Sequence, residues 1–425
     1  MVLEHSEHEE EHAHYHGVDR AEEHLSYNDA VKKLTDEVIP VQSETIPLRN
    51  ATGRILAENV ISRADIPHLP KSTRDGYAVN ISGETVEGAN LKIVGDLRIG
   101  IIPNIRVRKG EAVRIATGAF LPRGANAVLM KEYASIKNNT VVTTKPILIR
   151  ENVLLKGEDI QKGRVLLNKG ARIQPHHIAL LSMVGTKKIR AYRRPKVAFF
   201  STGDELVDFE SRITKDKIYD ATRPFLKSIL EELGAEPIDL GIAKDDFKVI
   251  RSKIFRGLRF DALVLSAGSS VGERDFVSSA ASSIKGVKLL VHGIAMRPSS
   301  PTGLATYKGK PFILLPGFPT SAIVSFLTLA RPAIMKRSGS LEMDYPMIKA
   351  RLAEGYRGKA GLTHFLRVQV KKSNGEYTAI IARPTDAQYS SWLGLANGVA
   401  IVKNESGEIR PDEPVDVFLI GSISG

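Results

Sequence analysis

The sequence predicts a multidomain α/β protein, and three stretches of the 425-residue chain together predict it. Residues 196–335 alternate between buried-strand and helix patterns, which is typical of βαβ units. Residues 45–150 and the residues after Pro346 show short alternating strands broken by Gly and Pro. Because a single core rarely serves more than about 250–300 residues, we expect roughly three domains.

The first 24 residues form a polar head rich in Glu and His. Such a composition cannot bury an apolar core, so the sequence predicts disorder here. Weak binding of a transition metal by the imidazoles is the alternative. The histidines are His5, His8, His12, His14, His16 and His24.

A helix is expected to begin near Ser26, because Asp29 follows three residues later in the position of a capping acid. Apolar residues then recur at helical spacing through Leu34 until Pro40 ends the pattern. This helix is predicted to be scaffold.

The alternation of apolar and polar residues predicts two β-rich regions. The first predicts strands over 92–95, 112–115 and 127–130. The second predicts strands over 365–370, 377–382 and 415–420, which would close the chain as a small β-barrel.

Between them the pattern predicts a parallel three-layer α/β domain. The expected strands cover 197–201, 237–242, 262–266, 288–291 and 312–315, and the expected helices cover 222–233, 246–255, 276–284 and 320–335.

Composition excludes several classes of site. With no cysteine, the chain has no disulfide, thiolate nucleophile, iron–sulfur cluster or thiolate zinc site. A formal net charge of +12 suits anionic ligands. Nucleic acid is not expected, since only 6% of the residues are aromatic and the basic residues cluster once, over Lys187–Lys196.

No targeting or membrane segment is visible. The N-terminus lacks a basic stretch followed by an apolar one, so a cytoplasmic location is expected. The longest charge-free run, Pro311–Ala330, contains Pro316, Gly317 and Pro319 and therefore indicates a strand, a turn and a helix.

Ligands of open parallel sheets bind beyond the carboxyl ends of the strands. The first such loop, Ser201-Thr-Gly-Asp-Glu205, places two carboxylates beside a flexible Gly203, which suits magnesium near phosphate. The alternative is an ordinary turn in which Asp204 caps the strand end.

The second loop is Ser266-Ala-Gly-Ser-Ser-Val-Gly-Glu-Arg-Asp275. It follows a buried strand and precedes a helix, so the backbone N–H groups of its small residues could approach a phosphate, with Asp275 beside them.

This pair of loops resembles the molybdopterin-binding domain shared by MoeA, MogA and gephyrin. Three further segments resemble MoeA and the E domain of gephyrin, and not MogA. They are Ser72-Thr-Arg-Asp-Gly-Tyr-Ala-Val79, Thr117-Gly-Ala and Lys156-Gly-Glu-Asp159-Ile. The resemblance extends from about Ser26 to the C-terminus.

The resemblance implies an elongated homodimer of four-domain subunits with the active cleft between subunits, so that Asp75 would face Glu205 and Asp275 across it. A discontinuous linker domain would cover 25–61 and 151–193, an inserted β-rich domain 62–150, a MogA-like molybdopterin-binding domain 194–338, and a C-terminal β-barrel 345–425.

The implied activity is magnesium-dependent insertion of molybdate into adenylylated molybdopterin, with release of AMP. An adenylyltransferase of the MogA or MoaB type is a possible partner. Carboxylates gathered around a phosphoanhydride are understandable only if a divalent cation neutralises them.

The implied site residues fall into three groups. The catalytic acids are Asp75, Asp159, Glu205 and Asp275. The magnesium ligands are Glu205, Asp246 and Asp275, although Asp246 could simply cap a helix. The substrate-binding residues are Thr117, Ser201, Thr202, Gly203, Asp246, Gly268, Ser269, Ser270, Arg297, Ser299, Ser300, Pro316, Pro319 and Arg367.

The sequence departs from the family pattern in three segments. The family's Pro-Gly-Asn-Pro turn appears as Pro316-Gly-Phe-Pro319, and a residue that is often polar is Leu395. The cationic Lys-Pro-Gly-Lys-Pro segment appears as Arg297-Pro-Ser-Ser-Pro301, where Arg297 could still hold an oxyanion and Ser299 or Ser300 could donate a further hydrogen bond.

Three alternatives therefore stay open. The first is a paralogue that takes tungstate, or no oxyanion, because fold does not fix activity. The second is a non-catalytic scaffold, as in gephyrin's second role. The third is MogA-like adenylylation of molybdopterin.

Overall fold

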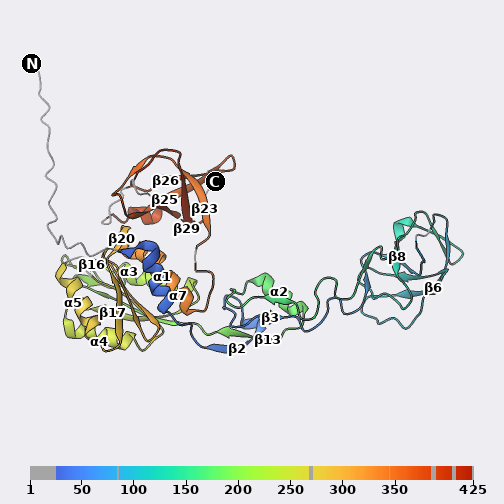
Figure 1. Cartoon of the computed structure of the whole chain (residues 1–425), viewed down its shortest axis with the longest axis horizontal. Coiled ribbons are helices and arrows are strands. Elements are labelled where there is room, and N and C mark those ends of the chain that lie inside the picture. The colour runs from blue at the N-terminus through green and yellow to red at the C-terminus, as the bar shows by residue number, and fades with distance from the viewer. Residues whose placement is uncertain are drawn as a thin grey trace, which may run out of the picture. The chain divides into compact units, whose positions relative to one another are not determined.

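The computed structural model describes residues 25–83, 86–267, 271–343, 345–383, 389–403 and 408–423, without the side chains of 271–275 and 292 (Figure 1). The head predicted to be disordered, residues 1–24, and the predicted ligands Gly268, Ser269 and Ser270 lie outside these ranges. Contacts divide the chain into two compact units. The first contains the residues up to Pro40, Arg194–Ser338 and Met343–Gly425, and the second contains Val41–Arg193 and Gly339–Glu342.

Helix α1 (Tyr27–Glu37) begins as predicted. The Asp29 backbone N–H donates to the Ser26 side-chain oxygen at 3.2 Å, and the helix ends before Pro40. Its buried Ala30 and Leu34 join the core of the α/β domain. This helix therefore packs in the first unit, whereas the prediction assigned residues 25–61 to the linker domain.

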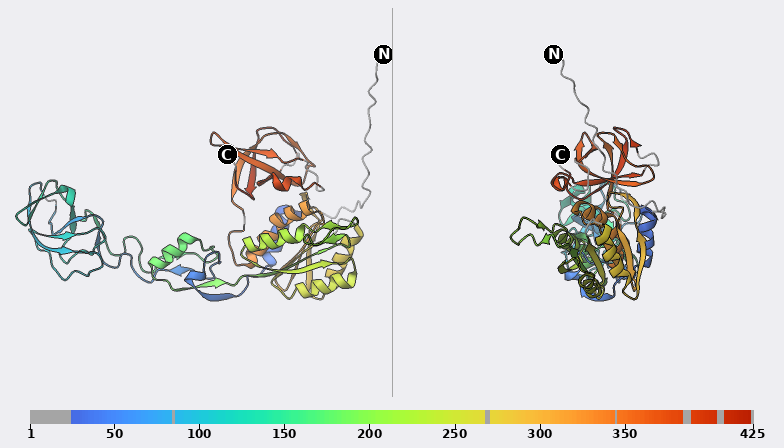
Figure 2. Two further views of the ribbon diagram at one scale, coloured as in Figure 1. Left: turned by 180° about the vertical axis from the view of Figure 1, so that it is seen from behind. Right: turned by 90° about the vertical axis from the view of Figure 1, so that its left-hand side faces the viewer.

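The α/β domain has three layers, with a six-stranded sheet in the middle (Figures 1 and 2). The sheet order is β17 (Glu236–Ala243), β14 (Lys196–Thr202), β18 (Ala262–Ser266), β22 (Lys310–Leu315), β21 (Gly303–Tyr307) and β19 (Val287–His292). One face packs under α1 and α3 (Thr222–Glu232), and the other packs under α4 (Phe247–Gly257) and α5 (Val271–Ser282).

The prediction of a wholly parallel sheet was wrong at one edge. Strand β21 was not predicted, and it pairs antiparallel with both β22 and β19. A two-residue turn, Lys308-Gly309, joins β21 to β22 with both φ angles positive, at 51° and 73°. Turns of this kind match the twist of a hairpin, but a Lys at the first position is a weak sequence signal for one.

Helix α5 begins at Val271, five residues before the predicted start at Phe276. The prediction had assigned residues 266–275 to a loop whose small residues approach a phosphate. Asp275 consequently belongs to the helix and not to the loop.

The predicted helix 320–335 is three segments, α6 (Pro319–Ser325), a π-helical turn (Phe326–Ala330) and α7 (Arg331–Arg337). Pro332 has no N–H to donate to the carbonyl of Thr328. The Tyr27 hydroxyl of α1 donates to that carbonyl instead, at 3.2 Å. The π turn thus becomes a point of attachment for α1.

The C-terminal domain is a closed five-stranded barrel, as predicted. Its interior is filled by apolar side chains such as Leu352, Val368 and Val417. The strands in barrel order are β25 (Thr363–Ser373), β26 (Glu376–Ile381), β23 (Met347–Leu352), β29 (Pro414–Leu419) and β27 (Gly398–Lys403). Two further strands connect the barrel to the α/β domain. Strand β20 (Ile294–Arg297) pairs parallel with β25, and β1 (Leu25–Ser26) pairs parallel with β20.

The second unit contains a linker built from three two-stranded ribbons and helix α2 (Pro175–Met183). Each ribbon pairs an outgoing strand with a returning one, as expected for a chain that leaves and re-enters around an insertion. The pairs are β2 (Ser43–Pro47) with β13 (Lys188–Tyr192), β3 (Val60–Ile61) with β12 (Val165–Leu167), and β4 (Lys71–Ser72) with β11 (Val153–Leu154).

The inserted domain is a six-stranded sheet with two apolar clusters. Its order is β8 (Ala127–Met130), β5 (Gly76–Val79), β7 (Glu111–Ile115), β6 (Asn90–Leu97), β10 (Thr140–Thr143) and β9 (Ala134–Lys137). Among the described helices of both units, none is long and apolar enough to cross a membrane.

Candidate functional site

Two buried hydroxyl groups mark the carboxyl end of β14. Ser201 and Thr202 are 1% and 3% exposed, and neither hydroxyl has a hydrogen-bond partner among the described residues. Leaving a buried polar group unpaired costs about 1–3 kcal/mol. These hydroxyls are therefore well placed to bind a polar ligand at the edge where ligands of such sheets bind.

The next residues of this loop hold Glu205 in place. The Gly203 N–H donates to the carbonyl of Ala243 on β17 at 3.1 Å. Gly203 has φ of 152°, and a Cβ atom there would lie 2.6 Å from the Glu205 carboxylate. The backbone conformation favours glycine, and any larger residue would also push the Glu205 carboxylate aside.

Further carboxylates lie on the adjoining loops after β14 and β17. The Asp204 N–H donates to Asp245 at 3.1 Å, and the Asp245 N–H donates to Asp204 at 3.4 Å. Asp246 accepts from the Val249 N–H at 2.9 Å and so caps α4. The capping interpretation of Asp246 thus accounts for its Oδ1 atom, and among the described residues no side-chain hydrogen bond is seen to Oδ2.

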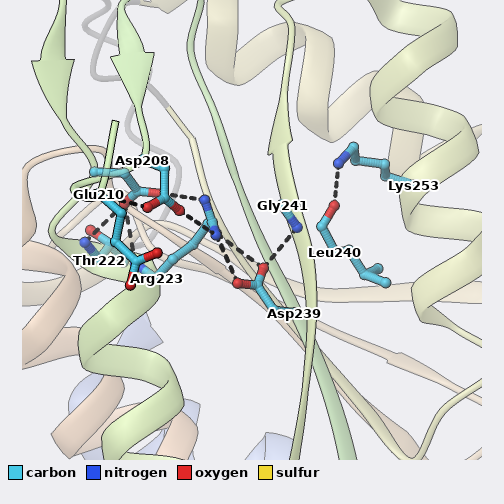
Figure 3. Close-up of polar contacts among 9 residues, drawn as sticks. Asp208, Glu210, Thr222, Arg223, Asp239, Leu240, Gly241 and Lys253 are labelled. Atoms are coloured by element: carbon cyan, nitrogen blue, oxygen red, sulfur yellow. Dashed lines mark hydrogen bonds and ion pairs between the residues drawn. The ribbon is translucent and has the colours of Figure 1, made fainter. Parts of the chain in front are cut away.

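Arg223 forms ion pairs that hold the segment after Glu205 in place (Figure 3). Its guanidinium group donates to both oxygens of Asp239 on β17, with Nε to Oδ1 at 3.0 Å and Nη2 to Oδ2 at 2.8 Å, and to Asp208 at 3.1 Å. Burial is the largest single influence on Asp239 and raises its pKa, but the hydrogen bonds from Arg223 and the Gly241 N–H, together with the charges of Arg223 and Lys253, outweigh it and lower this pKa overall. The ion pairs tie the short ribbon of β15 (Leu206–Val207) and β16 (Ile218–Tyr219) to the sheet.

Predicted residues of the two neighbouring strands also meet at this edge. Ser266 at the end of β18 donates to the carbonyl of Pro316 at 3.2 Å, and Pro319 begins α6. Phe318, in place of an amide side chain, is 43% exposed.

A second group of predicted residues lies where β20 joins the barrel. Arg297 is paired in register with His364 of β25, and Arg367 lies on the same strand. Arg297 is exposed and has no ion pair among the described residues. The Arg367 guanidinium lies 5.2 Å from the ring centre of Trp392, which is 1% exposed and whose indole N–H has no acceptor in the described part of the chain.

Tyr356 and His364 belong to this group, and sequence reasoning missed them. The Tyr356 hydroxyl lies 2.9 Å from His364 Nδ1, and His364 Nε2 lies 2.9 Å from the Lys359 carbonyl. Burial raises the pKa of Tyr356, while the charges of Arg367 and Arg297 oppose that rise. A histidine within an otherwise apolar strand pattern was the available signal.

Ser299 and Ser300 act differently from the prediction. Their hydroxyl groups donate within the protein, Ser299 to the carbonyl of Ser321 at 2.8 Å and Ser300 to that of Ile294 at 3.0 Å. A serine hydroxyl has one hydrogen to donate. These residues hold the turn after β20, and in this structure their hydroxyl hydrogens are engaged within the protein.

In the second unit, Asp75 and Thr117 are in direct contact. Asp75 precedes β5 and accepts from the Thr117 backbone N–H at 2.7 Å and from its hydroxyl at 2.9 Å. Both hydrogen bonds, with Lys131 at 3.7 Å, lower the pKa of Asp75. A Cβ atom at Gly76 would overlap the Leu129 carbonyl, so the Asp-Gly sequence lets β5 and β8 approach closely.

Asp159 lies in the linker, in the loop after β11, where its side chain is exposed. The loop lines a shallow surface hollow formed by residues 157–159 and 161–164. The Asp159 carbonyl accepts from Arg164 at 3.0 Å.

No three His, Asp or Glu side chains among those described come together to hold a metal ion. Asp275, a predicted ligand, lies outside the described side chains. Magnesium commonly binds one or two carboxylates and takes its other ligands from substrate phosphates and water. Glu205 and the second oxygen of Asp246, on adjoining loops, fit that donor set.

Comparison with known proteins decides the family. The MoeA N-terminal region (domain I and II) matches residues 25–185, the probable molybdopterin-binding domain matches 198–336, and the MoeA C-terminal region (domain IV) matches 349–420. A molybdopterin biosynthesis MoeA protein from Pyrococcus horikoshii is 32% identical, with 94% of this chain and 99% of that chain covered and a TM-score of 0.78. The chain belongs to the MoeA family.

Other relatives agree with this assignment. A second MoeA structure, from Pyrococcus horikoshii OT3, is 26% identical with a TM-score of 0.80 and covers 93% of this chain and 99% of its own. A Staphylococcus aureus (strain COL) protein named molybdopterin molybdenumtransferase is 29% identical over 406 residues, 94% of this chain and 96% of the relative. The predictions of an enzyme family and of a place in molybdenum cofactor synthesis are thereby confirmed.

Proposed function

We propose that this MoeA-family protein inserts molybdate into adenylylated molybdopterin in a magnesium-dependent reaction that releases AMP. The observation that carries the proposal is the pair of buried, unpartnered hydroxyls of Ser201 and Thr202 beside Glu205. They provide donors for an anionic substrate at the sheet edge where such ligands bind.

Each group of residues has a distinct part in this reaction. Ser201 and Thr202 orient the substrate by hydrogen bonds, and Glu205 with Asp246 would hold the magnesium ion. When bound, magnesium supplies the positive charge that a phosphoanhydride needs for cleavage. Asp75, whose pKa is lowered, stays ionised at neutral pH and can accept a proton or a hydrogen bond but cannot donate one.

Arg297 and Arg367 would hold the oxyanion. Two guanidinium groups can each form paired N–H bonds to a tetrahedral dianion. The Ser299 and Ser300 hydroxyls donate within the protein, so the oxyanion site is altered from the family pattern, and a changed oxyanion specificity such as one for tungstate is the second candidate.

The proposal is tested by mixing the purified protein with adenylylated molybdopterin and magnesium and following AMP release and metal incorporation. Molybdate and tungstate are supplied in separate reactions. AMP release with molybdenum bound is the expected outcome, and activity with tungsten alone would support the second candidate. No AMP and no metal would overturn the transferase proposal in favour of a binding scaffold. A separate reaction with molybdopterin and ATP tests the remaining alternative, because consumption of ATP there would indicate adenylylation.

A further inference from the structure

The pairing of β5 with β8 places Lys131 beside Asp75. Gly76, the first residue of β5, pairs with Met130, the last residue of β8, so Asp75 and Lys131 come to lie opposite each other at the ends of two antiparallel strands. The Lys131 backbone N–H donates to the Asp75 carbonyl at 3.0 Å. The short turn η2 (Lys131–Tyr133) begins at this point. The backbone of Lys131 is therefore held against that of Asp75.

The side chain of Lys131 is less fully engaged than its backbone. Its Nζ atom lies 3.7 Å from Asp75 Oδ2, beyond the range of about 2.7–3.2 Å for a hydrogen bond. The Lys131 side chain is 62% exposed and the Asp75 side chain is 51% exposed. Among the described residues, Asp75 is the only carboxylate within ion-pair distance of Lys131. Because a lysine ammonium has three hydrogens to donate, this one can bind a ligand while it stays beside Asp75.

Asp75 does not need Lys131 to keep its place. The backbone N–H and the hydroxyl of Thr117 both donate to Asp75 Oδ1, at 2.7 Å and 2.9 Å. Exposed ion pairs also contribute little to the stability of a fold. Neither the stability of the inserted domain nor the orientation of Asp75 therefore accounts for a lysine at this position.

An ionised Asp75 repels an anionic substrate unless a cation lies between them. In the proposed reaction Glu205 and Asp246 would hold the magnesium ion, so Asp75 needs another positive group. Lysine binds phosphate as a compact point charge. The Lys131 ammonium, beside Oδ2 of Asp75 and exposed, is placed to fill that role.

We propose that Lys131 is a further substrate-binding residue, whose ammonium bridges the Asp75 carboxylate and the phosphate of the adenylylated substrate. The inference rests on the proposed function and deepens it, because it names the substrate group that meets the Asp75 end of the inserted domain. One hydrogen of the ammonium is directed toward Asp75 Oδ2, and the other two are directed toward phosphate oxygens. Lys131 thereby contributes to substrate binding and not to the chemical step.

The test compares Lys131→Gln with the unaltered full-length protein in two measurements. The first is titration calorimetry with adenylylated molybdopterin in the absence of magnesium and oxyanion, and the second is AMP release in the complete reaction. Lys131→Gln should bind the substrate about tenfold more weakly, as expected for loss of one charged hydrogen bond. The KM for AMP release should rise by a similar factor while kcat changes little.

Two further variants separate an effect of charge from an effect on structure. Lys131→Arg keeps the positive charge and should retain most of the affinity. Lys109→Gln removes an exposed lysine just before β7, at the opposite end of that strand from Thr117, and should bind like the unaltered protein. Thermal melting should be the same for all of these variants, because none of them removes a buried contact.

Full affinity in Lys131→Gln, an equal loss in Lys109→Gln, or a fall in kcat at unchanged KM would overturn the inference. If the unaltered protein binds the substrate but releases no AMP, the transferase proposal fails, and the calorimetry still decides the role of Lys131. AMP release that persists while Lys131→Gln binds normally would leave the transferase proposal in place and remove only this role. Absence of substrate binding by the unaltered protein would overturn both.

Discussion

Single residues of the site could be predicted from the sequence only where a local motif carried them. Asp75 and Thr117 were chosen on separate motifs, and the structure joins them by two hydrogen bonds. Tyr356 and His364 escaped notice, because what matters about them is a contact formed by a short ribbon folding against a barrel strand. Such a contact has no fixed spacing in sequence.

Replacing Asp75 by Asn should abolish turnover without unfolding the protein. An amide oxygen can still accept from Thr117, but the negative charge is lost, and loss of a general base typically slows a reaction about 100-fold or more. AMP release is the measurement, and Asp96→Asn, an exposed carboxylate on β6, is the matched control. Activity equal to that of the control would remove Asp75 from the site.

Ser299 gives a prediction about stability. Its φ of 89° lies in the region that favours glycine, which is the residue of the family's motif at this position, and its hydroxyl bonds to the Ser321 carbonyl. Ser299→Ala loses the bond and keeps the strain, costing about 1 kcal/mol. Ser299→Gly loses the same bond but gains back about 1 kcal/mol of strain, so it should be the more stable variant. Chemical denaturation measures both, and the reverse order would show that the backbone is not strained.

At the scale of helices and strands, the sequence carried most of the information. Capping by Ser26 and the alternating strands were predictable because caps and periodicity are local. The edge hairpin of β21 and β22 was not, since its Lys308-Gly309 turn resembles an ordinary surface loop. The early start of α5 was also missed, because the small residues of 266–275 suited a phosphate-binding loop as well as the first turn of a helix.

The N-terminus of α2 should make the second unit sensitive to pH. His177 Nδ1 accepts from the Gln174 N–H at 3.1 Å, and burial with the charge of His176 lowers the pKa of His177 from its ordinary 6.5. Because the folded-state pKa is depressed, this stabilisation is present above pH 6.5 and is lost as pH falls through the folded value. Thermal melting of the unaltered protein should fall over that window, and His177→Gln, which has no titrating group there, should show a smaller fall. Identical pH profiles would contradict the prediction.

At the scale of the whole molecule, the order of α/β, β-rich and barrel regions was visible in the residue patterns. The prediction that a domain is inserted within the linker came only from the resemblance. Strands that pair across a hundred residues, such as β3 with β12, have no recognisable local sequence pattern. Asp75 and Glu205 belong to different units, and the prediction that they share a site formed by two subunits came from the resemblance. No pattern within one chain encodes that.

Mixing two inactive variants tests the proposed homodimer. If each site takes Asp75 from one subunit and Glu205 from the other, Asp75→Asn and Glu205→Gln proteins should each be inactive alone. Random exchange gives about half mixed dimers, each with one intact site, so the mixture should recover about a quarter of normal AMP release. Mixing two batches of Asp75→Asn is the control. No recovery, despite exchange shown by differently tagged subunits, would place both acids of a site in one subunit.

The pairing of β1 with β20 has a practical consequence for anyone shortening this chain. Leu25 and Ser26 lie against Ile294 and Ala295, on the strand that leads to Arg297. A truncation that starts at Leu25 keeps this edge strand and the cap of α1, whereas one that starts at Tyr27 removes both. Because the two strands are parallel, a fluorophore or affinity tag fused immediately before Leu25 would begin at the Ile294 end of β20, on the side away from Arg297.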